Sequence, residues 1–94
     1  MIKHVVCFKL KEGEDVDFAA NLLLSMKGNV SEIIDIEVGK DFLHSQRSYD
    51  IILIVTLKDK YALESYQKNQ YHSEVVKTHM HKVRESSVAV DYEF

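Results

Sequence analysis

Hydrophobic and polar residues alternate in several short stretches of the chain, as they do in half-buried β-strands. The first stretch spans residues 2–11, and its more apolar face includes a histidine: Ile2, His4, Val6, Phe8 and Leu10. A second runs from Ile34 to about residue 42, and a last one covers residues 88–94. Residues 49–57 are apolar on both faces, which is typical of a strand covered on two sides. The pattern therefore predicts four strands.

Two helical regions separate these strands. Asp15 is placed to cap a helix with the apolar stripe Val16, Ala19, Ala20 and Leu23. Gly28-Asn29 can supply the left-handed residue that ends it. Asp59 is placed to cap a short helix that runs to Tyr66, and polar residues 68–70 separate this helix from a longer one.

The longer helix has ionisable side chains on its apolar face. At about 3.6 residues per turn, one face contains His72, Val75, Val76, His79 and Val83. Lys77 and His81 are predicted to point away from that face. Tyr66 lies about a turn and a half before His72, so its phenol can turn toward the imidazole. We expect this pair to mark the floor of a ligand pocket.

The order strand, helix, strand, strand, helix, strand predicts an α+β fold of the ferredoxin-like split βαβ type. Residues 1–94 would form one domain, a four-stranded antiparallel sheet with helices on one face. The open face is predicted to be unusually apolar, with Val5, Cys7, Ile52, Ile54 and Ala89. Such a patch is expected to be buried against a second copy, giving a homodimeric α+β barrel.

Composition excludes several classes of function. The chain is 46% apolar and has a formal charge of −3, and its twelve Lys and Arg residues are scattered. Nucleic acid is therefore not an expected partner. No stretch has the apolar length of a membrane span, and the N-terminus does not read as a signal peptide, so we expect a cytoplasmic protein with no membrane partner. No metal or cofactor is predicted, because His79 and His81 would point apart on a helix.

Several pieces of the sequence together resemble the stress-responsive A/B barrel (Dabb) family, whose members include the plant cyclase that makes olivetolic acid. These pieces are IKHVVCFKLK, VGKDF, SYDIILIVTLKD, LESYQKNQYHSEV and VAVDYEF, in order over nearly the whole chain. The family often has His-Pro-x-His where this chain has Asn69-Gln70-Tyr71-His72. The cyclase has a histidine in the third strand, where this chain has Ile51.

The resemblance implies a pocket for a small hydrophobic, carbonyl or polyketide-like ligand between the sheet and the helices. His72 would match the catalytic base and Tyr66 the tyrosine that positions it or the substrate. His4 would belong to the pocket wall, and Val6, Phe8 and His79 are the further candidates for ligand binding. An imidazole titrates near neutral pH and suits a general base, and a phenol can donate to an enolate oxygen.

Other readings of the same residues stay open. His72, His4 and His79 can be core imidazoles that are hydrogen-bonded to backbone carbonyls. The protein can be a cyclase-like acid/base enzyme, a cofactor-free monooxygenase, a non-catalytic stress-related ligand binder, or a structural homo-oligomer with no pocket. An open cavity that reaches Tyr66 and His72 would favour the readings with a ligand, and a packed interior would favour the structural one.

Overall fold

The computed structural model describes residues 1–94, and its elements follow the predicted order. They are β1 (Ile2–Leu10), α1 (Val16–Leu24), β2 (Asp35–Lys40), β3 (Ile51–Leu57), α2 (Lys60–Lys68), the π-helix η1 (Tyr71–Lys77), α3 (Thr78–Val83) and β4 (Arg84–Glu93). The strands form one antiparallel sheet in the order β2-β3-β1-β4. The predicted α+β, ferredoxin-like fold is confirmed.

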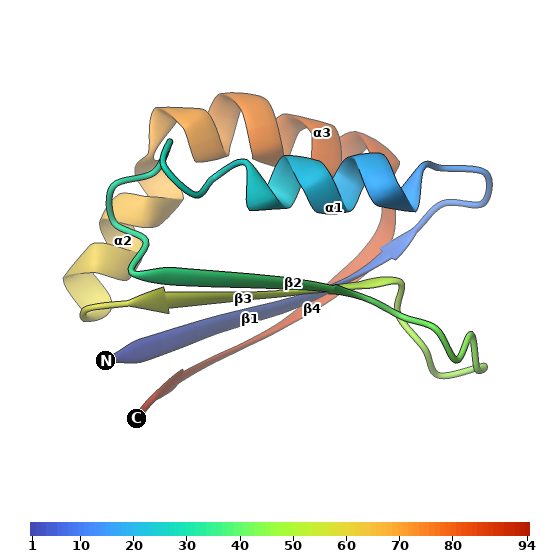
Figure 1. Cartoon of the computed structure of the whole chain (residues 1–94), viewed down its shortest axis with the longest axis horizontal. Helices are drawn as coiled ribbons and strands as arrows, with labels where there is room; N and C mark the ends of the chain where they lie inside the picture. Colours follow the sequence, from blue (N-terminus) through green and yellow to red (C-terminus); the bar gives the residue numbers. More distant parts are fainter.

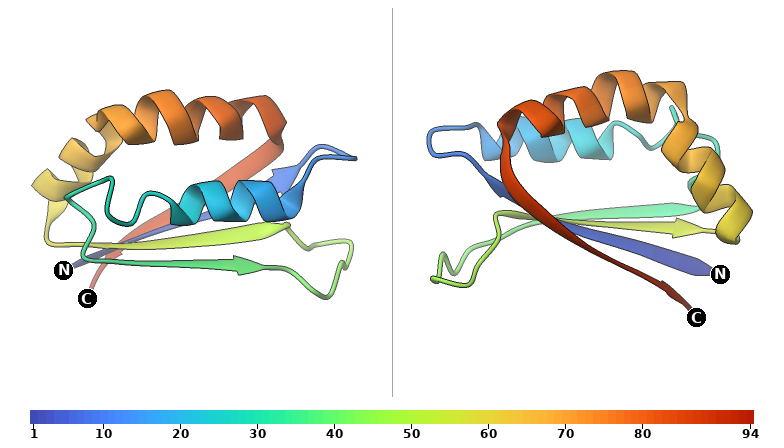
Figure 2. Two further views of the ribbon diagram at one scale, coloured as in Figure 1. Left: turned by 45° about the horizontal axis from the view of Figure 1, so that its top comes forward. Right: turned by 180° about the vertical axis from the view of Figure 1, so that it is seen from behind.

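The helices all lie on one face of the sheet. Figure 1 shows α1 and the η1–α3 segment side by side above the strands, with α2 at the end of the sheet where the termini lie. The views in Figure 2 show the same two layers and the other face of the sheet bare. The core fills the space between the layers with apolar side chains from both, including Leu23 and Met26 from the α1 region and Leu53 and Val55 from β3.

Helix α1 begins as predicted and ends earlier. The Asp15 carboxylate accepts a hydrogen bond from the Phe18 amide at 2.9 Å, and Ala19, Ala20 and Leu23 are buried. The helix ends at Leu24, because the Ser25 hydroxyl and amide both donate to the Leu22 carbonyl and the chain then enters a series of turns. Gly28, with φ of 84°, lies in those turns.

Asn69 separates α2 from η1. Asp59 caps α2 as predicted, accepting a hydrogen bond from the Ala62 amide at 2.8 Å. At Asn69 the backbone becomes extended, and its side-chain oxygen accepts hydrogen bonds from the amides of Tyr71 and His72 at 2.9 and 3.2 Å. This residue therefore ends one helix and begins the next, at the start of a π-helix that was not predicted.

The register of β4 against β1 decides which of its side chains face the helices. Ala89 is paired with Val6, and Val6 faces the helices, so the prediction that Ala89 lies on the open face was wrong. Val88, Val90 and Tyr92 lie on the open face instead, together with Val5, Cys7, Ile52 and Ile54. The alternation within a strand does not show which of its faces the helices cover when both faces contain apolar residues.

The structure contains no helix with the length and apolar character of a membrane span.

Asp50 ties the start of β3 to the end of β1. Its amide donates to the Phe8 carbonyl at 2.8 Å, and its carboxylate accepts from the Leu10 amide at 2.7 Å. The pairing of β1 with β4 shifts register between Lys9 and Leu10, and Leu10 itself is buried. The carboxylate therefore satisfies a buried amide at an irregular point of the sheet.

We expect Asp50→Ala to lower the free energy of unfolding by about 1–3 kcal/mol, because the Leu10 amide would lose its charged acceptor. Urea unfolding at neutral pH measures this change. Glu64→Ala is the matched control: it removes an exposed carboxylate paired with Lys68 and should cost about 0.5 kcal/mol or less. Equal effects of the two substitutions would contradict the role given to Asp50.

Candidate functional site

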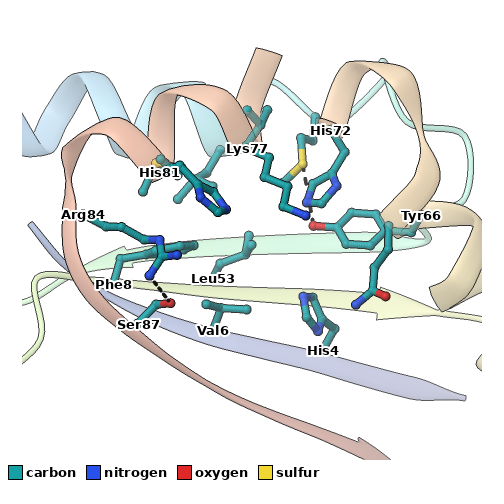
Figure 3. Close-up of a pocket in the computed structure, with 15 residues that line it drawn as sticks. His4, Val6, Phe8, Leu53, Tyr66, His72, Lys77, His81, Arg84 and Ser87 are labelled. Carbon is teal, nitrogen blue, oxygen red and sulfur yellow. Dashed lines mark hydrogen bonds between the residues drawn. The ribbon is translucent and has the colours of Figure 1, made fainter. Parts of the chain in front are cut away.

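A cavity of about 310 Å³ lies between the sheet and the η1–α3 segment. This volume is at the lower end of the range for small-molecule sites. The side chains that line it come from both layers, as Figure 3 shows: His4, Val6, Phe8, Leu23, Met26, Leu53, Tyr66, Gln67, His72, Val76, Lys77, Met80, His81, Arg84 and Ser87. The interior is therefore not completely packed around the predicted Tyr66/His72 pair.

Tyr66 is fully buried, and its hydroxyl has a weak partner. It donates to the Met26 sulfur at 3.7 Å, and a thioether is a poor acceptor. Burial raises the pKa of the phenol well above its ordinary value. Tyr66 therefore keeps its proton at neutral pH and can act as a hydrogen-bond donor, but not as a base.

His72 is held directly beside this phenol. The Asn69 side chain binds its amide, and its ring lies 4.5 Å from the Tyr66 ring, centroid to centroid, at 36°. Its Nδ1 atom is buried and has no hydrogen-bond partner. Burial lowers the pKa of His72, the charges of Lys77 and His4 lower it further, and a hydrogen bond with the Gln67 backbone opposes them. The ring is therefore predominantly neutral at pH 7, with an unpaired nitrogen.

His4 contributes a second imidazole from the sheet. The register of β1 and β4 sets it opposite Asp91, and the Asp91 carboxylate accepts a hydrogen bond from Nδ1. This bond fixes the ring and leaves Nε2 as its free nitrogen. The ring centroid is 5.6 Å from that of Tyr66, with the planes at 64°. Tyr66 thus lies in contact with two imidazoles, one from each layer of the fold (Figure 3).

The structure brings five of the six predicted site residues together. The cavity is lined by His4, Val6, Phe8, Tyr66 and His72. His79 lies outside it and packs edge-on against Phe18, with the ring centroids 4.9 Å apart. The reason is the π-helix, whose wider turns advance the chain by more residues per turn than an α-helix does. The face that follows His72 therefore contains Val76 and Met80, rather than Val75 and His79.

The same change of phase brings in residues that the sequence did not predict for the site. Lys77 and His81 were expected to point away, yet both line the cavity, as does Arg84 where β4 begins. An i, i+4, i+5, i+8 spacing from His72 would have placed Lys77 in the cavity, but no sequence signal indicated a π-helix here.

No group of three or more His, Cys, Asp or Glu side chains is arranged to hold a metal ion.

Comparison with known proteins identifies the family. The model of the family described as the stress responsive A/B barrel domain matches residues 2–94. A search of curated protein sequences finds no match.

Solved structures share the fold. A dimeric protein of unknown function with a ferredoxin-like fold from Bacteroides fragilis is 25% identical, with a TM-score of 0.78 over 99% of this chain and 95% of that one. A Dabb family protein from Mesorhizobium loti is 20% identical, with a TM-score of 0.76 over 99% of this chain and 95% of that one. A hydroxynitrile lyase from Passiflora edulis is 12% identical, with a TM-score of 0.84 over 97% of this chain and 90% of that one. The last two likenesses are evidence of fold alone.

The lowered pKa of His72 predicts an acid-dependent loss of stability. The unfolded chain takes up a proton on this ring below about pH 6.5, whereas the folded protein resists doing so, so stability is full above that pH and falls as the pH drops through the folded pKa. The loss is about 1.4 kcal/mol for each unit by which the pKa is lowered.

We therefore expect His72→Asn to unfold with a shallower dependence on pH between about 7.5 and 5 than the wild type, in urea titrations at each pH. His44→Asn is the control, because His44 is exposed in a loop at φ of 52°, a conformation that asparagine tolerates. An unchanged slope in His72→Asn would show that another group causes the acid sensitivity.

Proposed function

Because this chain belongs to the stress-responsive A/B barrel family, we propose that it is a homodimeric α+β barrel protein that binds a small hydrophobic carbonyl compound in its cavity. We further propose that it acts on this compound by acid/base chemistry of the cyclase type, with His72 as the base and Tyr66 as the donor. His4, Val6 and Phe8 form the wall that faces the ligand.

The observation that carries this proposal is the buried, unpaired Nδ1 of His72, a residue that lines the cavity. A buried polar atom without a partner costs about 1–3 kcal/mol, and natural proteins rarely keep one without a use for it. The neutral ring offers a lone pair that is shielded from water. A ligand that presents an acidic C–H or O–H to this nitrogen would supply the missing partner.

The chemistry follows from the two protonation states. His72 removes a proton from the carbon alpha to a ligand carbonyl, and negative charge develops on the carbonyl oxygen. The Tyr66 hydroxyl turns from the Met26 sulfur to that oxygen, a far better acceptor, and stabilises the enolate. The enolate carbon attacks a second carbonyl of the same molecule, and the protonated His72 returns its proton to the oxygen of that carbonyl.

The apolar part of the cavity supports ring closure. Val6, Leu53 and Val76 line it between the polar groups. Such a surface holds a flexible ligand chain in a folded conformation and brings its two reacting carbons together. This proximity accounts for much of the acceleration of an intramolecular reaction.

Binding without catalysis is the second candidate function. Asn69 occupies the place of the first histidine in the family's frequent His-Pro-x-His segment, and here its side chain is engaged in capping η1. The residues left for chemistry are then fewer than in the cyclase. The cavity would serve a bound metabolite equally well in this case.

The open face of the sheet supports the homodimer. No helix covers its apolar residues Val5, Ile54, Val88 and Val90, and Val90 is 63% exposed. At about 25 cal/mol per Å², burying several hundred Å² contributes on the order of 10 kcal/mol before the cost of association. The relative from Bacteroides fragilis is described as dimeric.

Turnover is testable with 1-phenylhexane-1,3,5-trione, a linear triketone that closes to 5-phenylresorcinol and water by aldol condensation. We expect the wild type to accelerate formation of 5-phenylresorcinol, measured by liquid chromatography with mass spectrometry. His72→Ala should reduce this acceleration at least about 100-fold, because the general base is removed. Tyr66→Phe should reduce it by about 10- to 100-fold, because a donor to the enolate is lost.

His79→Ala is the matched control, since that imidazole lies on the same helical segment but outside the cavity. It should retain the wild-type rate. If His72→Ala and His79→Ala were equally active on a compound that the wild type turns over, His72 would not be the base. A wild type that binds the triketone without converting it would favour the non-catalytic alternative.

The homodimer is testable by sedimentation. We expect Val90→Lys to be monomeric at concentrations where the wild type is a dimer, because a charge would be buried in the middle of an apolar contact. Asn21→Lys places the same charge on an exposed residue of α1 and should leave the dimer intact. A wild-type monomer, or a Val90→Lys dimer of unchanged affinity, would exclude association through this face.

A further inference from the structure

The cavity has two chemically different ends. Figure 3 shows Tyr66, His72 and His4 at one end and Arg84, His81, Ser87 and Phe8 at the other. Val6 and Leu53 lie on the sheet between them, and Lys77 extends from η1 toward Tyr66 and His72. The proposed acid/base chemistry uses only the first end. The second end remains without a role.

The second end is basic and contains no acidic residue. Its basic side chains, His81 and Arg84, lie close together along the chain where α3 and β4 meet, and both line the cavity. None of the fifteen lining residues is an aspartate or glutamate. This local excess of positive charge contrasts with the formal charge of −3 of the whole chain.

These two side chains have no acidic partner inside the protein. The ion pairs of the structure join other residues, and Asp91, the acidic side chain bonded to a cavity residue, is engaged by His4. The hydrogen bond made by Arg84 is a long one, from Nη1 to the Ser87 hydroxyl at 3.3 Å. Most of the donors of its guanidinium are therefore free to bind something else.

We propose that the ligand of this cavity carries a carboxylate, bound by Arg84 at the end opposite His72. This inference rests on the proposed function only in taking the cavity as a ligand site, and it adds the class of ligand, an amphipathic organic acid. The carboxylate faces the guanidinium, and the apolar body lies over Val6 and Leu53. The far end of the molecule then reaches Tyr66.

A carboxylate fits this set of groups better than a larger anion. A guanidinium presents two parallel N–H groups that match the two oxygens of a carboxylate, and Ser87 is next to it to donate a further hydrogen bond. The space of about 310 Å³ is shared with an apolar body, so the charged group has to be compact.

Anchoring one end of the ligand would also fix its direction. Arg84 and Tyr66 lie on opposite sides of Leu53 (Figure 3). With the carboxylate at Arg84, the length of the molecule therefore determines which of its carbonyls lies nearest Tyr66. A neutral ligand of the same shape could enter with either end first. The basic end would thus select both the class of ligand and its orientation toward His72.

The test compares two probes of the same shape, 4-pentylbenzoate and 4-pentylbenzamide, by isothermal titration calorimetry at low ionic strength and pH 7.5. We expect the wild type to bind the acid at least about tenfold more tightly than the amide, because only the acid forms charge-assisted hydrogen bonds. In Arg84→Gln the affinity for the acid should fall to that for the amide. The affinity for the amide itself should stay unchanged.

Two controls keep the comparison specific. Arg47→Gln removes the same charge from a residue that does not line this cavity, and it should keep the preference for the acid. Amide chemical shifts of Leu53 and Ser87 in NMR spectra should change with both probes, which places them in the cavity.

The outcomes separate this inference from the proposed function. Equal affinities for acid and amide in the wild type would overturn the inference and leave the cavity as a site for neutral carbonyl compounds. A preference that survives Arg84→Gln would overturn it too, because the charge effect would come from elsewhere. No binding of either probe, with no change at Leu53 or Ser87, would remove the ligand site and both proposals with it.

Discussion

The hydrogen bonds from Asn69 to the amides of Tyr71 and His72 are the local interaction on which the arrangement of the site depends. They end α2 and begin η1 within a few residues, so the phenol of Tyr66 and the imidazole of His72 meet from two different helices. A single continuous helix would project the two side chains in directions fixed by its pitch. The break at Asn69 allows the two rings to lie against one another above the sheet.

The π-helix that begins after this break determines the composition of the cavity. Its wider turns bring Lys77 onto the inner face, and His81 follows from α3. The same turns carry Val75 and His79 away from the cavity. π-Helical segments are uncommon and occur frequently at functional sites, where they give side chains positions that a regular helix does not offer. Here the result is one cavity with a neutral imidazole at one end and the Arg84 guanidinium at the other.

Burial shifts the pKa values of Tyr66 and His72 in opposite directions. Desolvation disfavours the charged form of each group, so it raises the pKa of the phenol and lowers the pKa of the imidazole. One side chain is thereby kept as a proton donor and its neighbour as a proton acceptor at the same pH. Both remain uncharged, which is the less costly state for groups inside a core.

The sequence by itself determined the order of the elements, the caps at Asp15 and Asp59, the apolar inner faces and the nearness of Tyr66 to His72. These features depend on residues close together in the chain, so periodicity and capping preferences reveal them. Only the tertiary structure decided the pairing of His4 with Asp91, the side of the sheet that Ala89 faces, and the entry of Lys77, His81 and Arg84 into the cavity. Strand register and the pitch of a helical turn are set by packing between layers, and two readings that differ by one residue look alike until the layers meet.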